Sequence, residues 1–303
     1  MTEPYQTLTT RHWPRDDIQQ VIDACFAVTF AEFRQLAETA TVPPSLARYA
    51  FNPLTARPLL RLEDGRLLAP VPQLIARRLS PIELYYQGLK CFGEPYSRDM
   101  GELLEDYVGR QLSTLPDADV HSEIEYGPTK KSRGKSIDWI VVFPDAVLLV
   151  EAKATRLRAD ARVGDENAER AVSTTLAEAF DQIDRTHQAI LNGVPEFADI
   201  PKDRPFIGLV AALDPWYMSN STATRARLPD PAVPTLVASL PEVETLVAIG
   251  QRLRASQVLQ QILGDPQMRV SILGSALSQF AEPEDENPIL EAAWKQYPFS
   301  GPS

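Results

Sequence analysis

Residues 136–153, SIDWIVVFPDAVLLVEAK, contain two apolar segments that flank Pro144-Asp145. Proline fixes its own backbone angle and aspartate bonds nearby amides, so this pair favours a tight turn. Segments 136–143 and 146–153 are rich in β-branched and aliphatic residues, which is typical of strands. The sequence therefore predicts an antiparallel β-hairpin.

A two-residue turn fixes the register of this hairpin. Counting outward from the turn pairs Ile140 with Leu149 and Asp138 with Glu151. Directly opposite residues project from the same face, with Cβ atoms about 4.5–5.5 Å apart. Two carboxylates at that distance repel each other, and a divalent cation between them removes the cost. A slip of one residue would place Asp138 on the other face, so the prediction depends on the register.

Glu151 and Lys153 stand two residues apart on the second strand, so both project from one face while Ala152 projects from the other. The preceding run 146–150 is apolar on both faces, which is typical of a central strand covered by helices. An ExK sequence at a strand end is most often a solvated terminus. The opposed Asp138 favours instead a metal site, in which the ammonium acts on a water or on a charged transition state.

The rest of the chain predicts the elements around this hairpin. Helices are expected at 99–113, 166–191 and 241–263, and further strands at 119–126, 205–213 and 234–239. The order is typical of an α/β domain with a mixed central β-sheet flanked by helices, which we assign to residues 96–303.

Residues 1–95 have a different pattern and are predicted to form an N-terminal helical accessory region. Apolar periodicity predicts one or two helices in 15–40 and another helix in 72–92. Between them, two short apolar runs flank Asp64-Gly65 in 57–69, which predicts a β-hairpin.

Two flanking helices offer further candidate side chains. On 99–113, Glu105 shares a face with apolar Val108 and Leu112, whereas Gly109 is expected on the wet side. A carboxylate at the edge of a buried face is explained by a metal or, equally well, by a salt bridge. On 166–191, Gln182 lies beside the apolar stripe and could reach the sheet, or could belong to the ordinary helix surface.

Basic residues flank both strands of the hairpin. They are Lys130, Lys131, Arg133 and Lys135 before the first strand, and Arg156 and Arg158 after the second. In an acidic protein, two basic clusters around one site are what a phosphate backbone would require. Each cluster by itself is equally consistent with a solvated loop.

The composition limits the function classes. The 303-residue chain has a net charge of −11, which argues against tight, non-specific coating of nucleic acid. The presence of only two cysteines and three histidines argues against a disulfide framework and against a Cys/His zinc site, and favours a cytoplasmic location. No signal peptide, membrane-spanning run or P-loop is apparent, so we expect no membrane association.

Together these residues resemble the PD-(D/E)xK nuclease superfamily, the restriction-endonuclease-like fold. The resemblance covers about 97–213 and rests on Glu105, Ile137-Asp138, Glu151-Ala152-Lys153 and Gln182. It implies that Asp138 and Glu151 bind Mg²⁺, for which Mn²⁺ can substitute, and that Lys153 acts on the attacking water. Glu105 would assist the metal site, and Gln182 would match a polar residue common on this helix.

The resemblance implies a metal-dependent nuclease, with DNA as the expected substrate and bacterial restriction or anti-phage defence as the expected setting. Two alternatives remain: a non-catalytic nucleic-acid- or protein-binding module that retains the fold, and an RNA-directed nuclease. A homo-oligomer, or a partner that supplies targeting or NTPase activity, is also compatible with the sequence.

Overall fold

The computed structural model describes residues 14–39, 52–79, 81–127, 133–154, 166–216 and 219–296. The chain divides into two compact units, Met1–Tyr96 and Ser97–Ser303. The first unit contains a three-stranded sheet and the second a five-stranded sheet.

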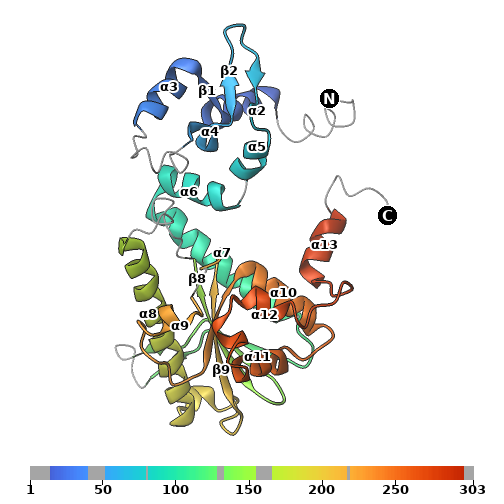
Figure 1. Ribbon diagram of the computed structural model, residues 1–303. Helices are drawn as coiled ribbons and strands as arrows, with labels where there is room; N and C mark the ends of the chain where they lie inside the picture. The colour runs from blue at the N-terminus through green and yellow to red at the C-terminus, as the bar shows by residue number, and fades with distance from the viewer. Residues whose placement is uncertain are drawn as a thin grey trace. The chain divides into compact units, whose positions relative to one another are not determined.

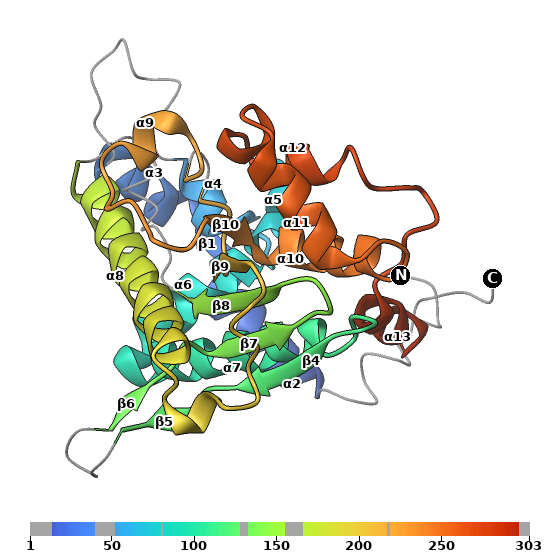
Figure 2. The same cartoon turned by 90° about the horizontal axis from the view of Figure 1, so that it is seen from below.

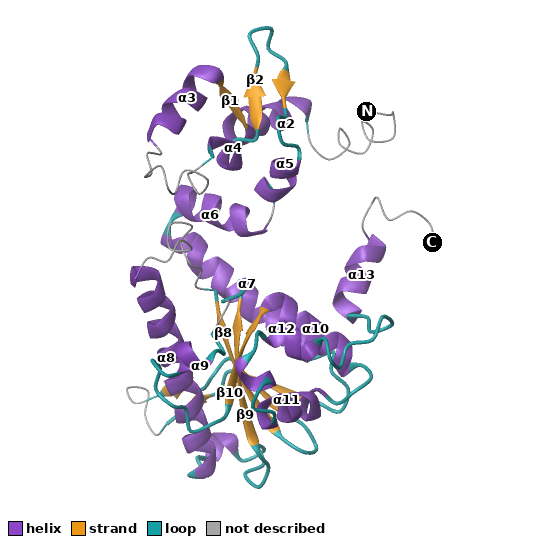
Figure 3. Cartoon of the chain, in the orientation of Figure 1, coloured by secondary structure: helices purple, strands orange, loops and turns teal. Residues whose placement is uncertain are grey.

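The five-stranded sheet forms the centre of the second unit (Figures 1 and 3). Its order is β10-β9-β8-β7-β4, with bounds Thr235–Ser239, Phe206–Ala212, Val147–Lys153, Trp139–Val142 and Asp119–Ser122. The β8–β9 and β9–β10 pairs are parallel, whereas β7–β8 and β4–β7 are antiparallel. The expected α/β fold with a mixed sheet is therefore confirmed.

The β7–β8 hairpin has the register that the Pro144-Asp145 turn predicts. The Phe143 amide donates to the Ala146 carbonyl at 2.9 Å, and Ile140 pairs with Leu149. The ladder ends at the pair Trp139–Val150, so Asp138 lies one residue before β7 rather than inside the strand.

Helices cover both faces of this sheet, because alternate residues of β8 pack in opposite directions. Leu148 and Val150 join a cluster with α7 (Glu94–Leu112), α10 (Leu240–Gly250), α11 (Ala255–Gly264) and α12 (Leu273–Leu277). Val147 and Leu149 pack against α8 (Glu166–Leu191). In Figure 2, α8 and the α10–α12 group lie on opposite sides of the strands.

Several expected boundaries differ from the structure. The expected strand 119–126 divides into β4 and β5 (Glu125–Tyr126), and β5 pairs with β6 (Gly134–Lys135) in a separate ribbon. The expected helix 241–263 is two helices, because Arg254 adopts an extended backbone that starts α11. This break allows both α10 and α11 to bury their apolar faces in the same cluster.

The predicted wet position of Gly109 is wrong. Gly109 is buried, and a Cβ atom placed there would lie 2.1 Å from the ring of Trp139. The indole Nε1 of Trp139 donates to the main-chain oxygen of Glu105 at 2.9 Å. The absence of a side chain at Gly109 thus lets α7 approach β7.

The first unit contains short elements around a small apolar core of Val28, Leu54 and Leu60. Ala27–Thr29 forms β1, where the sequence predicted only helix, and pairs in parallel with β2 (Leu59–Arg61). β2 pairs with β3 (Leu67–Leu68) as a hairpin, and Gly65 in its turn has φ 81°. The helices are α2 (Arg15–Val21), the π-helix η1 (Ile22–Phe26), α3 (Phe30–Thr39), α4 (Pro53–Ala56), α5 (Gln73–Arg78) and α6 (Pro81–Phe92).

Smaller elements complete the second unit. They are η4 (Pro195–Phe197), α9 (Thr222–Arg225), η5 (Met268–Val270) and α13 (Pro288–Gln296). Among the helices of the described residues, none has the length and apolar character needed to cross a bilayer.

The Gly109–Trp139 contact generates a stability prediction. Gly109→Ala places a methyl group inside the Trp139 ring, so we expect the free energy of unfolding to fall by about 1–3 kcal/mol, as overpacking usually costs. Urea denaturation measures this change. Gly101→Ala on the same helix is the matched control, because its Cβ meets no atom within 4 Å, and it should leave stability equal or higher. Equal stability of the wild type and Gly109→Ala would contradict the close approach.

Candidate catalytic and metal-binding site

Asp138 and the two residues before it are held at the open end of the β7–β8 hairpin by contacts to β8, to α8 and to the segment between β4 and β5. Its Oδ2 accepts from the Ala152 amide of β8 at 2.7 Å. The preceding Ile137 amide donates to Thr186 Oγ1 of α8 at 3.0 Å. The Ser136 amide donates to the Ile124 carbonyl at 3.0 Å. These bonds fix the carboxylate beside the end of β8 although the strand ladder has already stopped.

Glu151 and Lys153 form the second part of the site. Glu151 is only 2% exposed, and its Oε1 accepts from Lys153 Nζ at 2.7 Å. The same ammonium donates to Gln182 Oε1 of α8 at 2.9 Å. Among the described residues, Glu151 Oε2 is buried without a hydrogen-bond partner. Alternate residues of β8 face α8, so Glu151 and Lys153 project from the same face as Val147 and Leu149. The Lys153 ammonium therefore lies within reach of Gln182 on α8.

The carboxylates repel one another in this setting. Burial, followed by the charge of Glu151, raises the pKa of Asp138 to about 7. Burial also raises the pKa of Glu151, although Lys153 acts in the opposite direction. Each shift means that the ionised form is disfavoured in the protein by itself. A bound cation would reverse this balance by compensating both negative charges.

Glu105 comes from the opposite side of the sheet, on α7. It is half-buried, and burial followed by the charge of Asp138 raises its pKa. It therefore lies within electrostatic reach of the site. However, the residues that the structure describes contain no group of three Asp, Glu, His or Cys side chains arranged to hold an ion. Ligation by Glu105 stays a prediction.

The residues fit a divalent cation that needs few protein ligands. Glu151 Oε2 offers a buried oxygen with an unused lone pair, and Asp138 offers a carboxylate with one oxygen already fixed by Ala152. Mg²⁺ typically binds one or two carboxylates and completes its octahedron with water and phosphate oxygens. Asp138 and Glu151 would hold it.

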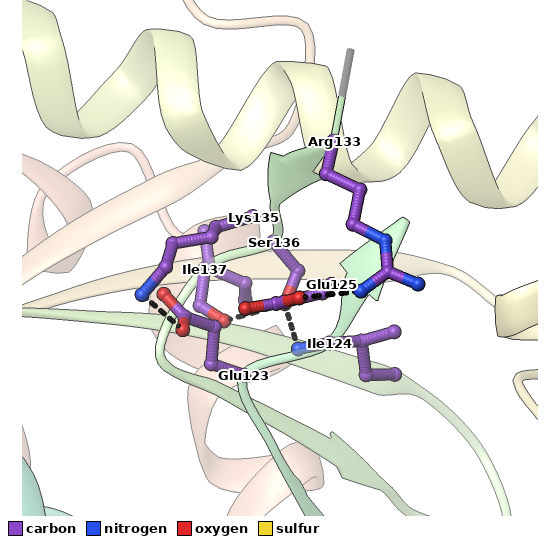
Figure 4. A network of polar contacts seen from close by, with 7 residues as sticks. All are labelled: Glu123, Ile124, Glu125, Arg133, Lys135, Ser136 and Ile137. Carbon is purple, nitrogen blue, oxygen red and sulfur yellow. Dashed lines mark hydrogen bonds and ion pairs between the residues drawn. The ribbon is translucent and has the colours of Figure 1, made fainter. Parts of the chain in front are cut away.

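The predicted basic clusters are described only in part. Arg133 Nη1 lies 3.2 Å from Glu125 Oε2, and Lys135 Nζ lies 2.7 Å from Glu123 Oε1 (Figure 4). Both cations are therefore paired within the ribbon segment. The other predicted nucleic-acid-binding residues, Lys130, Lys131, Arg156 and Arg158, lie outside the described residues.

Glu123 is a residue that the sequence reasoning missed. Its charge raises the pKa of both Asp138 and Glu105, which places it near the candidate site. The signal was present as two acids at alternate positions, 123 and 125, followed by two cations at alternate positions, 133 and 135. Such a pattern predicts a two-stranded ribbon with cross-strand ion pairs.

Comparison with known proteins adds little. No protein-family model matches the chain, and no curated protein matches its sequence. A solved structure, the small subunit of the heterodimeric restriction endonuclease R.BspD6I, superposes with a TM-score of 0.31 and 10% identity, covering 66% of this chain and 95% of that one. A score of this size does not establish a common fold.

The raised pKa of Asp138 generates a pH prediction. Its folded value of about 7 exceeds the ordinary 3.8, so ionisation opposes folding. Without a divalent cation, we expect the stability contributed by this group to be full below about pH 4 and to be lost as the pH rises through 7. Asp138→Asn keeps the acceptor for the Ala152 amide and removes the titration.

Thermal unfolding in EDTA at pH 5 and pH 8 tests this expectation. The wild type should lose more stability between the two values than Asp138→Asn, and Mg²⁺ at pH 8 should stabilise the wild type more than the variant. The same pH dependence in both proteins would show that the Asp138 carboxyl does not titrate in this window.

Proposed function

We propose that the second unit is a metal-dependent nuclease that hydrolyses phosphodiester bonds, with DNA as the substrate. One observation carries the proposal: two mutually repelling carboxylates, Asp138 and Glu151, share the buried end of a hairpin with an ammonium fixed beside them. Structural ion pairs alone do not explain the second carboxylate or the buried, unpartnered oxygen of Glu151.

Each residue has a role that follows from its contacts. Asp138 and Glu151 would hold Mg²⁺ or Mn²⁺, which would supply Lewis acidity toward a phosphate oxygen. The remaining step is attack by a water molecule on phosphorus. Lys153, held by Glu151 and Gln182, orients that water and stabilises the negative charge that develops on phosphorus. Gln182 is a positioning residue, because it reaches the reaction only through Lys153. Glu105 adds negative charge at the edge of the site.

DNA is preferred to RNA as the proposed substrate because the sequence contains no recognisable RNA-binding motif with stacking aromatics. Competition between labelled DNA and RNA in one cleavage reaction distinguishes the two substrates. Restriction or defence against phage is proposed as the setting only by analogy with other nucleases of this kind.

The principal alternative is a nucleic-acid- or protein-binding module without catalysis, which the net charge of −11 and the paired cations favour. A partner protein would then supply targeting or catalytic power. Binding without metal-dependent cleavage would identify this alternative.

Cleavage of plasmid and oligonucleotide substrates tests the proposed function directly. With Mg²⁺ or Mn²⁺, we expect cleavage by the wild type and none in EDTA. Asp138→Asn and Lys153→Ala should each reduce kcat by about a hundredfold or more, because each removes a charge that acts on the transition state. Unchanged activity in Lys153→Ala would overturn the assigned role of the ammonium.

Gln182 generates a separate prediction. Gln182→Ala should leave Lys153 paired only with Glu151 and lower kcat by about 10–100-fold, as loss of an orienting partner usually does. Arg185→Ala is the matched control on the same helix, because Arg185 is exposed and pairs with Asp181 at 2.9 Å. Equal losses in both variants would mean that the effect comes from the helix and not from Lys153.

A further inference from the structure

The segment that leads into Asp138 contains two ion pairs, each joining an acid near β5 to a cation at or beside β6. In Figure 4, Glu123 meets Lys135 and Glu125 meets Arg133, while Ser136 joins Ile124. Ser136 Oγ accepts a hydrogen bond from the Ile124 amide at 2.8 Å, and the Ser136 amide donates to the Ile124 carbonyl at 3.0 Å. Lys135 is thus held at a fixed position, three residues before Asp138.

Of the two pairs, Glu123–Lys135 is the one whose charges affect the pKa of a carboxyl at the candidate site. The charge of Glu123 raises the pKa of Glu105, and that of Lys135 lowers it. The Lys135 side chain is 64% exposed and that of Glu123 is 28% exposed. Lys135 is therefore an exposed cation within electrostatic reach of Glu105 and three residues before Asp138, and its ion-pair partner is already an anion.

We propose that Glu123 is a specificity-determining residue that competes with the substrate phosphate for Lys135. This inference rests on the proposed nuclease function. An exposed ion pair contributes little stability, so a phosphate that is also held by other contacts in the site displaces Glu123 readily. A phosphate without those contacts binds Lys135 more weakly than it would bind an ammonium that has no ion-pair partner, because it must first displace Glu123.

We expect this competition to disfavour nucleic acid that contacts Lys135 without the other contacts of the site. When Lys135 turns to a phosphate, Glu123 loses its partner and faces the phosphate backbone and the Glu105 and Asp138 carboxylates as a further like charge. Only the additional contacts of a nucleic acid that is correctly seated at the site compensate for this repulsion. Substrate selection would thereby be weakened by a change at Glu123 that leaves Asp138, Glu151 and Lys153 in place.

Binding of a fluorescein-labelled DNA duplex to the full chain in EDTA tests the proposal without requiring cleavage. At about 50 mM salt, Glu123→Gln and Glu123→Ala should each bind about three- to tenfold more tightly than the wild type, and the gain should shrink at about 200 mM salt. Asp203→Asn is the control, since it changes the net charge by the same amount. Asp203 is exposed and precedes Phe206, whereas the end of β9 at Ala212 is the one that pairs with Lys153.

A double-substitution cycle separates competition for Lys135 from a general charge effect. Lys135→Gln should weaken binding more in the Glu123→Gln background than in the wild type, because only there is the ammonium released. In cleavage assays with Mg²⁺, the change in Glu123→Gln should fall mainly on KM and much less on kcat, which a merely structural role would not produce.

The outcomes distinguish this inference from the nuclease proposal. Wild-type binding that Glu123→Gln and Glu123→Ala leave unchanged, or change only as much as Asp203→Asn does, overturns the role of Glu123 alone. Equal effects of Lys135→Gln in both backgrounds overturn it as well. No binding and no cleavage by any of these proteins overturns both this inference and the nuclease function on which it rests.

Discussion

Repulsion between two desolvated carboxylates is the constraint on which the candidate site depends. Asp138 and Glu151 meet at the end of the β7–β8 hairpin, where burial and mutual charge raise the pKa of both. Two hydrogen bonds compensate for this repulsion only in part: the Ala152 amide donates to Asp138, and the Lys153 ammonium donates to Glu151. The remaining imbalance is a physical reason for the site to bind a cation.

Both helical layers are needed to build this arrangement. From one face of the sheet, α8 provides Thr186 for the Asp138 segment and Gln182 for Lys153. From the other face, α7 brings Glu105 toward the same end, and its approach depends on the bare backbone of Gly109 against Trp139. Packing and hydrogen bonds from both layers thus fix the positions of these charged side chains, which is the preorganisation that the proposed catalysis would require.

The described cations near the site are not simply exposed to solvent. Lys135 and Arg133 pair with acids before and within β5, and Lys153 is shared between Glu151 and Gln182. In a chain of net charge −11, such pairing keeps the surface from attracting polyanions indiscriminately. Affinity for nucleic acid would then arise where phosphate can replace an internal acid, which links substrate binding to the geometry of the site.

The hairpin could be predicted from local sequence, because a turn of known length and a two-residue side-chain period fix which residues face each other. The same periodicity placed Glu151 and Lys153 on one face and identified a central strand covered by helices on both sides, and the mixed sheet followed from the order of elements.

The contacts between distant elements became visible only in the folded chain. The pairing of β4 with β7, which separates β4 from the ribbon, and the burial of Gly109 against Trp139 depend on contacts between segments far apart in the chain. Local periodicity contains no information about such contacts. The charged residues of the site could therefore be predicted from the sequence. Their burial and their interaction partners set the pKa of each carboxyl, and these depend on the fold.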